Sequence, residues 1–166
     1  MFTAHSDGRF VQGGRTTRCA LGRGGVIEAD AKREGDGCSP LGAWPIRRLL
    51  YREDKGLPAT ALPSAPIGRD DGWCDAPNDA AYNRPVTLPY PASAEAMWRE
   101  DSVYDLVVVL GHNDDPVVAG AGSAIFLHLA RDGYAPTEGC VALNRNDLEA
   151  LLAVAQIGDT VEIVRA

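Results

Sequence analysis

The stretch VYDLVVVL, from Val103 to Leu110, is β-branched and almost continuously apolar. Strands with both faces covered have this composition, so it predicts a central strand of a sheet. The segment SAIFLHLA (residues 123–130), which follows a loop, predicts the next strand. Alternation places His128 on one face of that strand with Ala124 and Phe126, and leaves Ile125, Leu127 and Leu129 on the other face.

Further short strands are expected on either side of this pair. GGVIEA (24–29) and IRRLLY (46–51) are expected strands, separated by the turn-forming stretch EGDGCSPLG (34–42). DTVEIV (159–164) is an expected closing strand.

The segment NRNDLEALLAVAQ (144–156) predicts the one clear helix. Its expected N-cap is Asn146, with Glu149 at the capping-box spacing, and Gly158 is expected to stop it. The expected fold class is therefore mostly β, with one helix near the C-terminus.

Residues 56–97 form a long region that holds most of the eleven prolines. This composition alone allows disorder, but four aromatic residues, which usually become buried, lie in or beside the region: Trp73, Tyr82, Tyr90 and Trp98. Long ordered loops in compact domains commonly serve function. We therefore interpret 56–97 as a packed excursion over a functional site, within a single domain that spans residues 1–166.

The totals describe a globular protein with an acidic surface. The formal net charge is −7 and Lys and Arg do not cluster. Such a surface repels a phosphate backbone, so nucleic-acid binding is not expected. No apolar run reaches the ~18 residues that a membrane span needs, and the start MFTAHSDGRF lacks the basic and apolar regions of a secretory signal.

The four cysteines, Cys19, Cys38, Cys74 and Cys140, are widely spaced. No C-x-x-C pair occurs, so no structural zinc site is expected, and nothing points to another metal or a cofactor. A disulfide between Cys74 and either Cys19 or Cys38 is an alternative to free thiols.

Cys140 follows Gly139 in the turn APTEGC. Gly139 lets the backbone approach a ligand, and the amides of both residues are candidate donors to an oxyanion. A thiol becomes a nucleophile beside a base, and His112 and His128 both flank the loops around Cys140. The residues alone support two interpretations equally: a catalytic Cys140–His128 pair, or a buried apolar cysteine and a structural histidine.

The stretch GSAIFLH…APTEGCVAL resembles the L,D-transpeptidases with a YkuD-type catalytic domain. His128 matches the family's histidine at a strand end. The family's motif Ser/Thr-His-Gly-Cys-apolar is matched by Thr137, Gly139, Cys140 and Val141. The resemblance implies that Cys140 is the nucleophile and His128 its base.

A second segment, KREGDGCSPLGAWPI (32–46), is similar to an upstream stretch of the same family. The two segments occur in the family's order, and the resemblance runs from about Gly24 to Leu143. It implies a YkuD-like β-sandwich or barrel.

Glu138 stands where the family usually has a second histidine. A carboxylate beside a thiol opposes its ionisation unless it is turned away or paired with an imidazolium. We predict that Glu138 orients His128 or His112. The loop between His128 and Cys140 is also shorter than usual and Leu129 replaces a common glycine, so we expect a divergent branch of the family.

His112 also allows two interpretations: a loop histidine that caps a turn, or a second site histidine that replaces the one missing at Glu138. If strands 103–110 and 123–129 run parallel, His112 and His128 lie at the same edge of the sheet. If the strands run antiparallel, the two histidines lie at opposite ends of the pair. The sequence does not distinguish these cases.

Arg84 and Arg99 lie near the aromatic residues of the excursion. A fork-shaped guanidinium suits a carboxylate, so these two are the candidates for holding a carboxylate of diaminopimelate.

The resemblance implies peptidoglycan L,D-transpeptidation, in which a thioester on Cys140 links donor and acceptor stem peptides. It also implies acylation of Cys140 by carbapenem-type inhibitors. The divergent TEGC motif leaves a linkage through the L-Ala carbonyl to diaminopimelate as an expected variant. We expect a monomer that acts in the periplasm, with the cytosol as the alternative location.

Two other functions stay open at this point. One is a peptidoglycan L,D-carboxypeptidase or endopeptidase that uses the same Cys–His site. The other is a non-catalytic wall-binding module in which Cys140 is structural.

Overall fold

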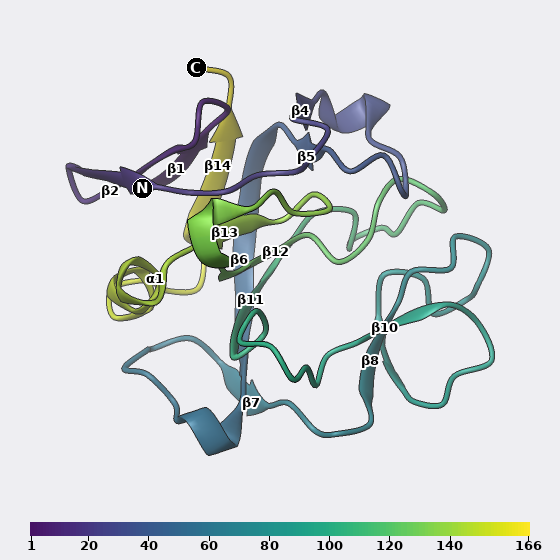
Figure 1. The fold of residues 1–166 in the computed structure, drawn as a ribbon. Helices are drawn as coiled ribbons and strands as arrows, with labels where there is room; N and C mark the ends of the chain where they lie inside the picture. The colour runs from purple at the N-terminus through teal and green to yellow at the C-terminus, as the bar shows by residue number, and fades with distance from the viewer.

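A curved sheet of nine strands forms the body of the molecule in the computed structural model, which describes residues 1–166 (Figure 1). Eight strands follow one another in the order β13 (Val141–Leu143), β12 (Phe126–Leu129), β11 (Leu106–Leu110), β6 (Gly42–Tyr51), β14 (Thr160–Val164), β1 (Phe2–His5), β2 (Arg9–Gln12) and β3 (Arg15–Arg18). The ninth, β7 (Ser64–Pro66), pairs with β6. The fold is mostly β, as the sequence predicts.

The two ends of this sheet approach each other. The segment after β3 makes isolated β-bridges from Ala20 to Ala142 and from Gly22 to Thr137. These bridges connect the segment that follows β3 to β13 and to the turn that precedes β13. The sheet is therefore nearly closed into a barrel.

The ten-residue strand β6 links the two halves of the sheet. Its first residues pair with β14, and the segment from Ile46 to Tyr51 pairs with β11. The sequence predicts only this second segment, 46–51. The pairing of β11 with β12 is antiparallel, with Val107 opposite His128. This settles the strand direction that the sequence leaves open.

The two faces of β12 belong to two separate apolar clusters. Ile125, Leu127 and Leu129 join the larger core together with α1. Phe126 lies in the second cluster, which also contains Trp73 and Cys140. The predicted alternation along this strand is therefore confirmed.

The region 56–97 contains more strand than the sequence suggests. Besides β7 it holds a three-stranded sheet of β8 (Asp71–Cys74), β9 (Pro85–Thr87) and β10 (Ala94–Ala96), with β8 in the middle. The prediction of an irregular region is wrong in this respect. Proline hides such strands from sequence patterns, because it is tolerated on edge strands, and β7 and β9 are both at edges.

The region nevertheless packs as predicted, as a cover on one face of the main sheet. Trp73 is buried and meets Phe126 edge-on, with ring centroids 5.0 Å apart. Figure 1 shows β8 and β10 to one side of β11 and β12.

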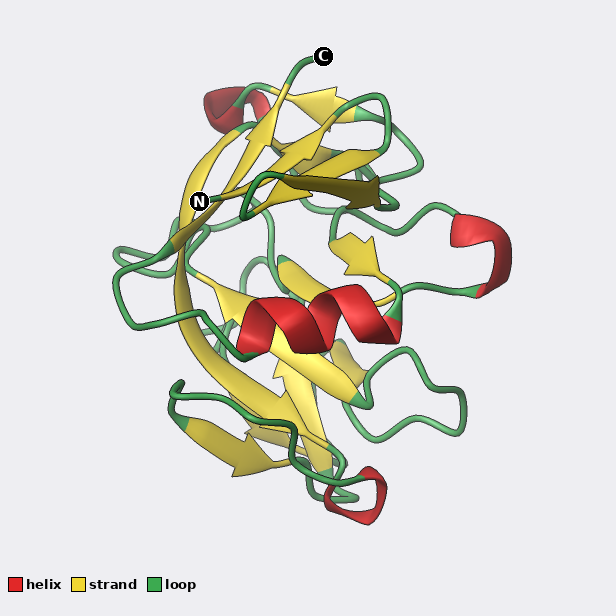
Figure 2. Cartoon of the chain, turned by 90° about the vertical axis from the view of Figure 1, so that its left-hand side faces the viewer, coloured by secondary structure: helices red, strands yellow, loops and turns green.

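The only α-helix, α1 (Arg145–Leu152), lies across the sheet (Figure 2). Its N-cap is Asn144, whose side chain accepts a hydrogen bond from the Asp147 amide, and not Asn146 as predicted. Asn144 caps the helix because it is in extended conformation and stands three residues before Asp147, the geometry that capping requires. The helix also ends earlier than expected, since the chain turns at 153–154 and Gly158 belongs to the next turn.

The predicted strand 24–29 shrinks to β4 (Val26–Ile27), which pairs with β5 (Ser39–Pro40). Gly25, at φ +78°, turns the chain just before β4, so a longer strand cannot form. Short 3₁₀ turns occur at η1 (Ala29–Ala31), η2 (Glu53–Lys55) and η3 (Asp132–Tyr134).

All four cysteines are free, so neither of the disulfides considered from the sequence is present. No helix combines the length and the apolar character that crossing a membrane requires.

Candidate active site

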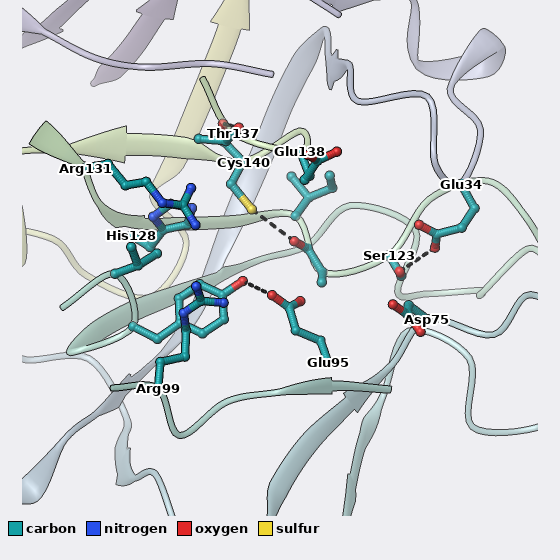
Figure 3. A pocket seen from close by; sticks show the side chains of 14 residues that line it. Glu34, Asp75, Glu95, Arg99, Ser123, His128, Arg131, Thr137, Glu138 and Cys140 are labelled. Carbon is teal, nitrogen blue, oxygen red and sulfur yellow. Dashed lines mark hydrogen bonds between the residues drawn. The ribbon is translucent and has the colours of Figure 1, made fainter. Parts of the chain in front are cut away.

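A pocket of about 370 Å³ opens between the main sheet and the cover formed by 56–97 (Figure 3). It is lined by Cys140 and His128, two residues that the sequence singles out and that come from different strands or turns. Thr137, Glu138 and Arg99 also line it. Gly139 lies in the turn that carries Cys140, whereas His112 and Arg84 do not line this pocket.

The turn that presents Cys140 is closed by the Thr137 hydroxyl. Thr137 Oγ1 accepts a hydrogen bond from the Gly139 amide at 3.1 Å and donates one to the Cys140 carbonyl at 2.7 Å. Ser39 Oγ donates to the Gly139 carbonyl at 2.8 Å. These bonds hold the turn rigidly beside the segment that carries Ser39.

Only glycine fits at position 139. Its φ is +138°, and a Cβ would lie 2.9 Å from the Cys38 carbonyl oxygen. Gly139 therefore allows the turn to pack directly against the backbone at Cys38.

The Cys140 thiol lies between two backbone groups. Sγ donates a hydrogen bond to the Ala124 carbonyl at 3.2 Å and accepts one from the Phe126 amide at 3.4 Å. Burial raises the pKa of Cys140 to about 12. At neutral pH the resting thiol is therefore protonated.

The His128 imidazole is fixed in one tautomer by its neighbour. Nδ1 lies 2.9 Å from the Leu129 carbonyl oxygen, which can only accept, so Nδ1 carries the proton and Nε2 keeps its lone pair. The Tyr104 ring meets the imidazole edge-on at a centroid distance of 5.4 Å. Burial lowers the pKa of His128 to about 4, so the ring rests neutral.

Glu138 points toward Arg23 rather than toward a histidine. Its Oε2 accepts a hydrogen bond from Arg23 Nε at 2.9 Å, and the carboxylate side chain is 79% exposed. Contrary to the prediction, the structure therefore shows no contact through which Glu138 orients His128 or His112. The reason is the bridge between Gly22 and Thr137, which brings the neighbouring Arg23 next to the turn.

His112 is separated from His128 by the antiparallel pairing of β11 and β12. It is buried against Trp44, edge-on at 4.7 Å, and its Nδ1 has no hydrogen-bond partner. Burial, together with the charge of Lys32, lowers the pKa of His112 to about 4. The structure does not bring His112 to the pocket.

The two predicted arginines have different positions. Arg99 lines the pocket, but its Nε and Nη2 donate to Asp101, at 2.8 and 2.7 Å. Arg84 lies in another hollow, together with Asp79 and Asp114.

The pocket is also lined by residues that the sequence does not single out: Glu34, Asp75, Glu95, Tyr104 and Arg131. Tyr104 Oη donates a hydrogen bond to Glu95, and burial raises the pKa of that carboxyl. Arg131 offered the one usable hint, because it follows closely on the predicted strand that ends near His128. The carboxylates come from the excursion and from the segment before β5, whose return to the pocket no local pattern indicates.

The pocket thus brings together a thiol, in a turn that requires glycine, and a neutral imidazole, the two residue types that cysteine acyl-transfer enzymes use. Residues 4–163 match the family model of the L,D-transpeptidase catalytic domain, YkuD. The chain therefore belongs to this family, as the two sequence segments suggest.

The fold is similar to that of a solved structure, Mycobacterium tuberculosis L,D-transpeptidase 1. The TM-score is 0.45 at 15% sequence identity, and the match covers 99% of this chain. It covers 60% of the other chain, so this chain spans less than two thirds of that chain's length. Among curated proteins no significant match is found.

Proposed function

We propose that this chain is a peptidoglycan L,D-transpeptidase in which Cys140 is the nucleophile and His128 the general base. The family supports the reaction class. One observation carries the residue assignment: with Nδ1 bound to the Leu129 carbonyl, the Nε2 lone pair of His128 is available in the pocket that holds the Cys140 thiol.

In the first half-reaction, Nε2 of His128 takes the thiol proton while Sγ attacks a carbonyl carbon of the donor stem peptide. The new C–S bond places negative charge on the carbonyl oxygen. Of the two amides expected to stabilise it, that of Gly139 is bound to Thr137 Oγ1, so the Cys140 amide is our candidate donor. The C–N bond then breaks, the imidazolium protonates the leaving amine, and a thioester remains.

In the second half-reaction, an amine of the acceptor stem attacks the thioester carbon. Nε2 accepts the amine proton and returns it to the departing sulfur, so the enzyme regains its thiol and neutral imidazole. If water attacks instead, the product is a shortened stem peptide, and the enzyme acts as a carboxypeptidase or endopeptidase.

The pKa values favour proton transfer during the attack rather than before it. With the thiol near 12 and the imidazole near 4, the neutral pair is strongly preferred over the thiolate–imidazolium pair in the empty pocket. A bound donor supplies the electrophile that makes the transfer favourable, since sulfur loses its proton as it gains a bond to carbon.

The charges of the pocket fit a substrate with groups of both signs. Arg131 is exposed at the pocket, and three carboxylates line its other side: Glu34, Asp75 and Glu95. Diaminopimelate in a stem peptide offers a carboxylate and an amine. This supports peptidoglycan as the substrate, and with it a periplasmic site of action. We include the linkage from L-Ala to diaminopimelate in the proposal.

The proposal is tested by incubating the protein with purified muropeptides and measuring product masses. We expect a cross-linked dimer, whose fragmentation identifies the bond, and no product with Cys140→Ala. The matched control is Cys19→Ala, since Cys19 is also buried with its pKa raised to about 12 but lies outside the pocket. If shortened monomers are the only products, the enzyme is a hydrolase. If Cys140→Ala forms the same products as the parent protein, the thioester mechanism is refuted.

A further inference from the structure

Asn83 ties the cover to the loop that precedes β12. Its side chain is buried and uses every hydrogen-bonding group. Oδ1 accepts from Trp73 Nε1 and from the Ala124 amide, both at 3.0 Å. Nδ2 donates to the carbonyls of His112, at 3.2 Å, and Asn113, at 2.7 Å. One amide group thus joins β8, the start of the 111–124 loop and its end.

The last of these partners, Ala124, has an unusual backbone. Its φ is +53°, the left-handed region that residues with a Cβ seldom adopt. Residues in such conformations persist only where surrounding bonds hold them. The bond from the Ala124 amide to Asn83 is one that holds this residue.

The carbonyl of Ala124 is the acceptor of the Cys140 thiol proton, and Figure 3 shows this bond as a dashed line from the sulfur. The direction of that carbonyl depends on the backbone conformation of Ala124. An amide held by Asn83 on one side of the residue therefore fixes the group that meets the sulfur on the other side.

We propose that Asn83 is a positioning residue for the Cys140 thiol, acting through the left-handed backbone of Ala124. The inference rests on the proposed role of Cys140 as nucleophile. Asn83 lies in the region 56–97, so this region does more than cover the pocket. It sets where the sulfur rests and which backbone groups meet it.

The two backbone contacts of Sγ have opposite effects on its proton. The Phe126 amide donates to the sulfur and favours the thiolate, whereas the Ala124 carbonyl accepts from the thiol and favours the protonated form. If Ala124 turns away, only the contact that favours the thiolate remains. The thiol then ionises more readily.

The other groups whose charges or rings lie near the sulfur make no hydrogen bond to Asn83 or Ala124. They come from separate segments and include charges of both signs: Lys32, Glu95, Tyr104, His128 and Glu138. A change in thiol reactivity is therefore assigned to the backbone contact.

The test is the rate at which iodoacetamide alkylates Cys140, followed by peptide mass mapping across a range of pH. For Asn83→Ala we expect the apparent thiol pKa to fall by about one unit, which is an alkylation rate about tenfold faster at a fixed pH below the pKa. A side chain with only a structural role leaves this pH profile unchanged.

A second variant reaches the same backbone without touching Asn83. In Ala124→Val a β-branched side chain makes the left-handed conformation much less favourable, so the carbonyl turns and the same acceleration is expected. This variant keeps the test decisive if Asn83→Ala does not fold.

A control is Asn144→Ala, which removes another hydrogen-bonding asparagine, the exposed N-cap of α1, which follows β13 and does not line the pocket. It destabilises the protein and leaves the alkylation profile of Cys140 as in the parent. An unchanged profile in both Asn83→Ala and Ala124→Val overturns the proposal. So does an equal acceleration in Asn144→Ala, because general loosening then explains the effect.

The same proteins are then given a donor muropeptide. Slower thioester formation in Asn83→Ala, despite faster alkylation, is expected because the sulfur has lost its fixed position. If the parent protein forms no thioester at all while the alkylation difference persists, the proposed function fails and the positioning by Asn83 stands.

Discussion

The two buried histidines differ in the hydrogen bonding of their Nδ1 atoms. His128 and His112 are about equally buried, and burial lowers the pKa of each to about 4. His128 commits Nδ1 to the Leu129 carbonyl, which leaves Nε2 for the pocket. His112 packs against Trp44 away from the pocket, and its Nδ1 has no partner. Burial and pKa therefore do not identify a base, whereas the hydrogen bond of the second nitrogen does.

The difference between the two histidines is tested most strongly by removing each imidazole in turn. We expect His128→Gln to slow acylation of Cys140 by about 10²–10⁴-fold, the range that general-base catalysis contributes. In His112→Gln, the matched control, the acylation rate should stay within about twofold of the parent rate, because this substitution makes only a small change in packing. The acylation rates of both variants are measured with a donor muropeptide, by stopping the reaction at successive times. Equal losses in the two variants would contradict the assignment of His128.

The two histidines should be alike in their effect on stability against acid. An unfolded histidine binds its proton near pH 6.5, whereas each folded one binds it only near pH 4. Between these values the unfolded state holds more protons, so stability falls as pH falls. Each histidine should contribute a loss of about 3 kcal/mol between pH 7 and pH 4.

Denaturant unfolding at several pH values measures this loss. Either single glutamine variant should recover about half of the histidine contribution, because the remaining histidine still titrates. A variant that unfolds with the same pH dependence as the parent would show that its histidine does not rest neutral in the fold.

Thr137→Val removes the hydroxyl that closes the turn of Cys140 and keeps the shape of the side chain. The Gly139 amide loses its acceptor and the Cys140 carbonyl its donor. We expect acylation to slow by about tenfold, because the nucleophile is less well positioned. Thr137→Ser keeps the hydroxyl and should retain the parent rate. A slow serine variant would locate the effect in the methyl group instead.

Glu138→Gln should have the smallest effect. The carboxylate is exposed and paired with Arg23, and its charge raises the pKa of Cys140. Removing the charge should lower the thiol pKa slightly and change acylation by less than about threefold, since exposed pairs contribute little. The orienting role expected from the sequence predicts the opposite, a higher thiol pKa and slower acylation. The pH profile of Cys140 alkylation separates the two.

The sequence predicts the parts of this molecule that local patterns encode. The apolar run at β11 and the alternation along β12 are strong signals, so both strands form, although each begins three residues later than predicted, and the two faces of β12 are as expected. The turn with Gly139 and Cys140 is equally local. These segments hold the proposed nucleophile and base, which is why the pocket contains both.

The remaining features depend on contacts between distant segments. The partner of Glu138 is set by a bridge to Gly22, and the distance of His112 from the pocket follows from the antiparallel pairing of β11 with β12. Asn83 lies between Pro77 and Pro85 in a stretch that suggests a loop, and its four hydrogen bonds become visible only in the structure. Tertiary pairing of this kind leaves no periodic pattern in the sequence.

The most direct test of the central claim is the mass of the intact protein after reaction with a donor muropeptide or a carbapenem, followed by peptide mapping. We predict one acyl adduct, located on Cys140, that forms in the parent and in His112→Gln, forms slowly in His128→Gln and is absent from Cys140→Ala. An adduct on Cys19, Cys38 or Cys74 with Cys140 unmodified would contradict the account.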